Sequence, residues 1–287
     1  MQTRRHAILA LSLGLGTLGL DACGKGEPDA PKPPERGSLG WALAGDWRLD
    51  RRRDRYRHPL QTLLFWGLSG DMTVLEVLPG VGWYTCILAP FLAANGGKLI
   101  AASFDPEAPS QAQREVLSAW DARFRRDIAR YGEIECTIVA RGRALAPVGS
   151  IDLAIVANTV NTMMAEGVAE RVFADIYAAL KPGGALGVEQ HRAASSRLQS
   201  PNADTGYVTE AYVRLLAQEA GFEFVAASDV NANPRDTRRH PFGVWTLPPT
   251  LRTSPLGRPP DPDFDTSPFE AIGESDRMTL KFRKPIL

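Results

Sequence analysis

The length, composition and charge of the chain exclude several classes of protein. Its 287 residues can form one large domain or two modest ones, and 44% hydrophobic with 23% charged residues is close to the average of globular proteins. Thirty-three basic residues balance 33 acidic ones, so the charge gives no support for a nucleic-acid partner, and four scattered histidines lack the spacing of metal ligands.

Residues 1–23 have the pattern of an export signal. Arg4 and Arg5 precede an apolar stretch, residues 7–20, which is too short to span a bilayer comfortably and is typical of a signal peptide. Residues 20–23 (LDAC) resemble a bacterial lipobox, in which the cysteine is acylated and becomes the mature N-terminus. We therefore expect an envelope lipoprotein that is anchored to the membrane through Cys23 and faces the periplasm.

Two points about this signal stay open. Secretion into the periplasm without a lipid is the alternative to anchoring, and the arginine pair is compatible with the general secretory route or a twin-arginine route. Residues 24–37 are rich in proline and charge and lack an apolar face, which predicts an extended tether.

Residues 38–72 are expected to form a helical segment in front of the main domain. Six arginines crowd positions 48–57, and the favoured interpretation is a solvated helical face, with an anion- or headgroup-facing patch as the alternative. Pro59 suits the first turn of a helix whose apolar residues recur at three- and four-residue spacing.

The main domain, residues 73–287, begins with a stretch that resembles a ligand cradle. Residues 74–78 form a short apolar strand that carries Glu76, and the chain then turns at Pro79-Gly80-Val81-Gly82. Glycine lets the backbone approach a ligand closely, and the helix that follows offers free N–H groups in its first turn. An ordinary turn between a strand and a helix is the alternative interpretation.

The chain then alternates between strands and helices as far as residue 227. The predicted strands are residues 74–78, 98–104, 135–140, 151–157, 185–189 and 222–227, and helical patterns cover residues 87–92, 110–131, 165–180 and 207–220. Such alternation predicts a parallel sheet with helices on both faces.

The last part of the chain has a different character. Residues 231–274 are rich in proline and have no sustained periodicity, so they are expected to form a long irregular insertion. Residues 278–283 alternate between apolar and polar side chains, which suits an edge strand. Cys86 and Cys136 lie in apolar patterns and are expected to be free thiols.

Taken together, this order of elements resembles the class I S-adenosylmethionine-dependent methyltransferases. Glu76, Gly80 and Gly82 match the acid and two of the three glycines of that family's first motif, and Leu78 stands where a third glycine is usual. Residues 180–184 (LKPGG) match a second landmark of the family. The wider E-x-x-P-G-x-G-W-Y-T pattern is similar to a group of bacterial predicted methyltransferases with poorly defined substrates.

The resemblance implies an α/β, Rossmann-like methyltransferase fold: a doubly wound, mostly parallel, seven-stranded sheet with an antiparallel last strand. It implies transfer of a methyl group from S-adenosyl-L-methionine to an unidentified small-molecule acceptor. The residues that it assigns to the cofactor are Glu76, Pro79, Gly80, Gly82, Trp83, Tyr84, Asp105 and Asn158.

Several of these assignments have alternatives. Asp105 would hold the ribose hydroxyls, or it is a turn-forming Asp-Pro. Asn158 would face the transferable methyl group, or it caps a strand. His191 is the candidate catalytic base, although a structural histidine fits the same position.

The competing functions differ in their support. A dinucleotide oxidoreductase would need a glycine where Thr85 stands. A non-catalytic envelope lipoprotein that retains the fold as a binding or structural module is the main alternative, because S-adenosylmethionine is made in the cytoplasm.

Overall fold

The computed structural model describes residues 33–286. Its strands are β1 (Thr73–Val77), β2 (Lys98–Ser103), β3 (Ile134–Ile138), β4 (Ile151–Ala157), β5 (Leu180–His191), β6 (Glu223–Ser228) and β7 (Arg277–Arg283). Its helices are α1 (Leu39–Ala44), α2 (Asp54–Arg57), α3 (Pro59–Trp66), α4 (Thr85–Asn95), α5 (Gln111–Phe124), α6 (Ile128–Tyr131), α7 (Val160–Ala165), α8 (Ala169–Ala179), α9 (Glu210–Glu219) and α10 (Ser267–Ile272). Two short 3₁₀ turns are η1 (Arg51–Arg53) and η2 (Gly243–Thr246). The signal and Cys23 lie outside the described residues.

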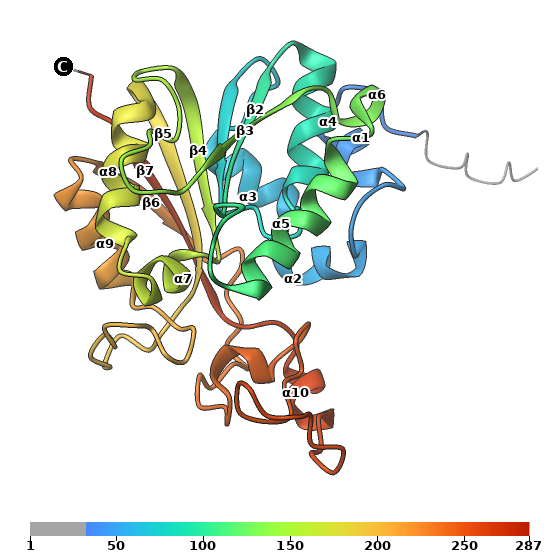
Figure 1. The fold of residues 1–287 in the computed structure, drawn as a ribbon, viewed down its shortest axis with the longest axis vertical. Coiled ribbons are helices and arrows are strands. Elements are labelled where there is room, and N and C mark those ends of the chain that lie inside the picture. The colour runs from blue at the N-terminus through green and yellow to red at the C-terminus, as the bar shows by residue number, and fades with distance from the viewer. Residues whose placement is uncertain (1–32, 287) are drawn as a thin grey trace, which may run out of the picture. The chain divides into compact units, whose positions relative to one another are not determined.

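All seven strands form one sheet, in the order β3-β2-β1-β4-β5-β7-β6 (Figure 1). Strand β7 pairs antiparallel with β5 and β6, and the other neighbours pair in parallel. This arrangement confirms the predicted doubly wound, mostly parallel sheet with an antiparallel last strand. The expectation of an edge strand at residues 278–283 is wrong, because β7 is paired on both sides and β6 forms the edge.

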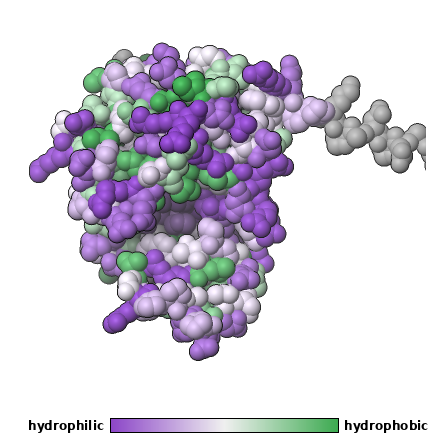
Figure 2. All heavy atoms as spheres, turned by 45° about the vertical axis from the view of Figure 1, so that its right-hand side comes forward, coloured by the Kyte–Doolittle hydropathy of each residue, from purple (hydrophilic) through white to green (hydrophobic). Residues whose placement is uncertain are grey.

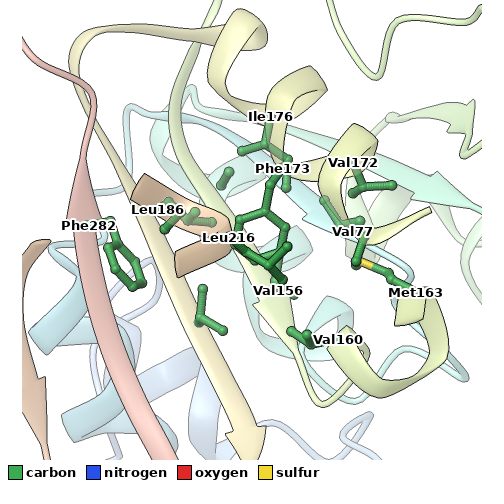
Figure 3. Close-up of a cluster of buried hydrophobic side chains, with 14 of the residues drawn as sticks. Val77, Val156, Val160, Met163, Val172, Phe173, Ile176, Leu186, Leu216 and Phe282 are labelled. Atoms are coloured by element: carbon green, nitrogen blue, oxygen red, sulfur yellow. The ribbon is translucent and has the colours of Figure 1, made fainter. Parts of the chain in front are cut away.

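Two apolar cores cover the two faces of the sheet, because successive side chains of a strand point to opposite faces. Leu75 and Val77 of β1 pack on the face covered by α7, α8 and α9, where Figure 3 shows Phe173, Ile176 and Leu216 meeting the strands. Val74 belongs to the core on the other face, beneath α1, α3, α4 and α5. Glu76 is two residues from Val74 and therefore points to that second face.

The structure differs from two of the expected helices. The pattern over residues 110–131 yields α5 and α6, and Asp127 caps α6 by accepting a hydrogen bond from the Arg130 amide at 3.2 Å. The pattern over residues 165–180 yields α8 alone, and α7, which was not predicted, precedes it across a turn at Gly167 with φ 65°. A left-handed glycine of this kind ends a helix at little steric cost.

The fifth strand begins earlier than the expected residue 185. It starts at Leu180, and its register against β4 shifts between Ile151 and Leu153, so the Lys-Pro-Gly-Gly sequence lies inside an irregular part of the strand. Lys181 there donates to Asp152 Oδ1 at 2.6 Å. The local sequence indicated a stop, but the strand pairs with β4 on both sides of it, at Leu180 and again from Ala185.

The arginine-rich stretch was expected to be a solvated helical face, and this prediction is wrong for half of its members. Arg48 is buried and binds both carboxylate oxygens of Asp54, at 2.6 and 2.7 Å. Arg53 and Arg57 point inward, where both bind Glu274. The acidic partner lies more than 200 residues away in sequence, so the local pattern contained no sign of it.

The insertion of residues 231–274 lies below the sheet in Figure 1 and is tied to the body by buried side chains. Asp236 accepts hydrogen bonds from the Tyr207 hydroxyl at 2.9 Å and the Asp276 amide at 2.8 Å, and lies 2.8 Å from His240 Nε2. Asn231 donates to Thr279 Oγ1 at 3.0 Å. Apart from η2 and α10, side-chain hydrogen bonds thus take the place of regular secondary structure in ordering this segment.

Residues 33–286 contain neither a candidate membrane-spanning helix nor a candidate metal site, and both of their cysteines are free. No helix there is long and apolar enough to cross a membrane. No group of His, Cys, Asp or Glu among these residues could hold a metal ion. Cys86 and Cys136 are both free thiols, as expected.

Candidate functional site

A cavity of about 210 Å³ lies where β1 and β4 end. The turn after β1, the residues after β4 and two arginines before the sheet line it, namely Arg53, Arg57, Glu76, Val77, Leu78, Pro79, Gly80, Val81, Trp83, Tyr84, Ala157, Asn158 and Thr159. Ligands of open α/β sheets bind outside the carboxyl ends of the strands. In Figure 2 the surface is hollowed between the sheet body and the lower part of the molecule, with hydrophilic residues in the hollow.

The turn after β1 has three residues in the left-handed backbone region. Leu78, Gly80 and Gly82 have φ values of 50°, 60° and 87°. A Cβ placed on Gly80 would meet no atom within 4 Å, so the backbone there faces open space. A Cβ on Gly82 would lie 2.2 Å from Phe124 Cε2, so that glycine is needed for packing against α5.

Leu78 occupies the position where the methyltransferase motif usually has glycine. Its left-handed backbone is the conformation that glycine adopts without cost. The leucine side chain is 4% exposed and joins the apolar core beneath α7 and α8. The turn therefore keeps the shape of the motif, and the buried side chain offsets the strain of the backbone.

Glu76 is held at the bottom of the cavity. It is 3% exposed and accepts a hydrogen bond from Thr85 Oγ1 at 2.7 Å, and Trp120 Nε1 donates to the same hydroxyl at 3.2 Å. Burial raises the pKa of Glu76 to about 8, although the bond from Thr85 acts in the opposite direction. The carboxyl is therefore mainly protonated at neutral pH unless a cation approaches it.

Glu189 of β5 sets the orientation of Asn158. The fully buried Glu189 accepts the Asn158 side-chain amide at 2.9 Å and the Tyr84 hydroxyl at 2.7 Å, and forms an ion pair with Arg277 at 2.9 Å. With its nitrogen bound, Asn158 presents its carbonyl oxygen, and this buried Oδ1 has no hydrogen-bond partner among the described residues. The neighbouring Thr159 Oγ1 is in the same state.

Trp83 forms an apolar part of the cavity wall and lies close to two guanidinium groups. It is 6% exposed, and the guanidinium groups of Arg48 and Arg57 lie 5.2 and 4.8 Å from its ring centre. Tyr84 packs edge-on against it with ring centres 4.8 Å apart. The buried Trp83 Nε1 has no hydrogen-bond partner in residues 33–286.

Most of the residues that the sequence assigned to the cofactor meet at this cavity. Glu76, Pro79, Gly80, Trp83, Tyr84 and Asn158 line it, and Gly82 supports the turn from behind. Asp105 is not part of the lining; its Oδ1 accepts the Glu107 amide at 2.9 Å, which is the turn geometry of the alternative interpretation. Its position after β2, beside β1, still suits a partner for a ligand that extends beyond the cavity.

His191 does not line the cavity either. Its Nδ1 lies 2.6 Å from Ser275 Oγ, and burial together with the charges of Arg277 and Arg57 lowers its pKa to about 3. An imidazole with that pKa is neutral and a weak proton acceptor. The structure thus places His191 in a structural role beside the site and gives no support for it as a general base.

Four residues of the site were not predicted from the sequence: Arg53, Arg57, Thr159 and Glu189. Glu189 had a usable signal, because it is a charged residue at the end of a strand that is otherwise buried. Arg57 was part of a motif that carried the family resemblance, but its arginine-rich surroundings favoured a solvated face. Nothing in the local pattern distinguished Arg53 or Thr159.

Comparisons with known proteins identify the fold. No protein-family model matches the chain, and no curated protein matches it in sequence. Among solved structures, the [4+2]-cyclase SpnF is similar with a TM-score of 0.55 at 20% identity, over 85% of this chain and 86% of that one. A putative sarcosine dimethylglycine methyltransferase from Galdieria sulphuraria is similar with a TM-score of 0.52 at 15% identity, over 82% of this chain and 86% of that one.

The sheet order and these similarities agree. The chain has the Rossmann-like fold of the methyltransferases. At these identities the similarity establishes the fold alone, and the two proteins are named for different reactions. Function must therefore be argued from the site.

Proposed function

We propose that the protein is an S-adenosylmethionine-dependent methyltransferase that acts on a small-molecule acceptor. The observation that carries the proposal is the cavity at the end of β1, which is lined by Gly80, whose backbone has open space beside it, and by Asn158, whose side-chain oxygen has no hydrogen-bond partner among the described residues. The turn and the strand end are where the resemblance to class I methyltransferases assigns the cofactor. The acceptor itself is not specified by these residues.

The residues present fit part of this cofactor. A side chain on Gly80 would fill the space that its backbone leaves open, and the buried Asn158 Oδ1 and Trp83 Nε1 await polar partners. At about 210 Å³, the cavity is smaller than the roughly 300–1,000 Å³ of typical ligand sites. The nucleoside part would therefore lie outside it, and Asp105 remains the proposed partner for the ribose.

The residues of the cavity have roles that suit a displacement reaction, whose rate depends on how the reactants are aligned. When bound, S-adenosylmethionine supplies a sulfonium methyl group, which a nucleophile of the acceptor displaces. Pro79 and Gly80 would bind the methionine part, Asn158 would accept a hydrogen bond from the ligand, and Trp83 with Tyr84 would exclude water. Because positioning alone can supply much of the rate of such a displacement, the weak basicity of His191 is compatible with the reaction.

A thermal-shift titration of the full-length protein tests the cofactor. Ligand at about a hundred times its dissociation constant adds roughly 2.7 kcal/mol, which raises the melting temperature of a chain of this size by about 5–10 °C. We expect this shift with S-adenosylmethionine and with its demethylated product. NAD serves as the control and should give no shift, because Thr85 replaces the glycine of a dinucleotide loop. No shift at millimolar S-adenosylmethionine would contradict the proposal.

The alternative is a non-catalytic binding or structural module of the cell envelope. It would share the fold and the location with the methyltransferase and transfer no methyl group. The thermal-shift titration identifies a module that has lost the cofactor, because such a module would respond to neither ligand.

We also propose that the protein is a lipoprotein anchored through Cys23 and facing the periplasm, with secretion of an unlipidated protein as the alternative. The support is the lipobox-like sequence at residues 20–23. Cells fed labelled palmitate should incorporate the label into the wild type and into Cys86→Ala, and lose it in Cys23→Ala. Cys86 is a matched control because it is buried in the core. Label retained by Cys23→Ala would refute the anchor.

A further inference from the structure

Two arginines of the cavity wall have hydrogen-bond donors that the described residues leave unused. Arg53 and Arg57 bind Glu274 through their Nε atoms, at 2.5 and 2.9 Å. Among the described residues, no hydrogen bond uses the Nη1 or Nη2 atoms of either side chain. Both guanidinium groups line the cavity beside the glycine turn. Their free ends form the paired donors that carboxylate and phosphate oxygens accept.

The charges around this pair do not balance. Three guanidinium groups, those of Arg53, Arg57 and Arg277, share the two carboxylates of Glu189 and Glu274. This leaves one positive charge in excess, in side chains that are 17%, 12% and 1% exposed. Buried charges of proteins are normally paired. An anionic ligand in the cavity would supply the missing partner.

The ionisation of the cluster is consistent with this excess. Burial lowers the pKa of Arg57, Glu274 opposes that effect, and the like charges of Arg277 and Arg53 add to it. Glu274 is buried, which would raise its pKa, but Arg57 and Arg277 bring it down to about 2. Glu274 is thus ionised throughout the neutral range, and the arginines still outnumber their acids.

We propose that Arg53 and Arg57 form an anion-binding subsite that holds one carboxylate or phosphate-like group of the ligand in this cavity. Such a group can belong to the amino-acid end of the cofactor or to the acceptor, and the chemistry of recognition is the same for both. The inference rests on the proposed function only where it assigns the group to the cofactor.

Calorimetric titrations of the full-length protein distinguish the two sources. If the cofactor carries the group, Arg57→Gln and Arg53→Gln weaken the binding of S-adenosylhomocysteine about tenfold or more and leave methylthioadenosine, which has no carboxylate, unchanged. If the acceptor carries it, the same variants leave S-adenosylhomocysteine unchanged. Inorganic phosphate then binds to the wild type saturated with S-adenosylhomocysteine, and the variants lose that binding about tenfold or more.

Arg55→Gln is the matched control, because Arg55 is an exposed arginine of α2, the helix that contains Arg57, and its replacement should leave every affinity unchanged. Arg57→Lys keeps the positive charge and replaces Arg57→Gln in the titrations if the glutamine variant does not fold. The subsite is overturned if the Arg53 and Arg57 variants change neither S-adenosylhomocysteine nor phosphate binding, or if Arg55→Gln weakens binding equally. A wild type that binds phosphate but no nucleoside keeps the subsite and refutes the methyltransferase proposal.

Discussion

Replacing Glu189 by alanine is expected to lower the free energy of unfolding by about 3–5 kcal/mol, which is the usual cost of removing one partner from a buried ion pair. Glu189 is fully buried and is the common partner of Arg277, Tyr84 and Asn158. Its loss leaves the Tyr84 hydroxyl and the Asn158 amide without acceptors inside the protein. Urea denaturation monitored by circular dichroism measures the change.

The matched control for Glu189 is another acid that pairs with an arginine of β7. Glu223 binds Arg283 at 3.0 Å, but both side chains are about half exposed, and an exposed pair contributes about 1 kcal/mol or less. Glu223→Ala should therefore change the urea midpoint little. Equal losses in the two variants would show that the Glu189 cluster contributes no more than a surface pair.

Replacing Gly80 by valine is expected to abolish the thermal shift produced by S-adenosylmethionine in a protein that still folds. No atom of the described residues lies within 4 Å of the added Cβ, so the backbone leaves room for a side chain, which we expect to extend into the cavity that Gly80 lines. The left-handed backbone at φ 60° adds a strain of about 1–2 kcal/mol, which a domain of this size can tolerate.

Gly149→Val separates the effect of backbone strain from the effect of filling the cavity. Gly149 has a φ of 62° and open space around its Cβ position, but it lies before β4 and away from the cavity. This variant should melt at nearly the same temperature as Gly80→Val and keep the full ligand shift. If Gly80→Val also kept its shift, the cofactor would have to bind elsewhere.

The two variants address different properties of the same site. Glu189 belongs to the cluster that holds Asn158 and Tyr84 in place, and its replacement is measured as a loss of stability. Gly80 contributes only space for the ligand, and its replacement is measured as a loss of S-adenosylmethionine binding. The anion subsite is a third property of the site. Its two residues, Arg53 and Arg57, come from the segment before the sheet.

Much of the fold was predictable because its signals are local. The apolar runs of β1 and β4 predicted strands, and the alternation with helices predicted a parallel sheet. The glycine turn after β1 was visible for the same reason, since left-handed backbone favours glycine within a few residues. These features depend on neighbours in the chain, and a single sequence contains them.

The site was predicted less completely because its partners are distant in sequence. Glu274 reaches Arg57 across 217 residues, and Glu189 reaches Tyr84 across 105. The same distance explains why the arginine-rich stretch was expected to face solvent. A pattern of charges shows spacing along the chain but not which acid lies opposite.

The sequence alone thus determined the succession of strands and helices along the chain and the turn after β1, and its resemblance to a known family gave the candidate cofactor residues. Only the tertiary structure decided which of two similar glycines faces open space and which packs on Phe124, and that His191 lies in a cluster that keeps it neutral. The physical reason is that burial and charge are sums over all neighbours in space. Most of those neighbours are supplied by other strands and by the insertion before β7.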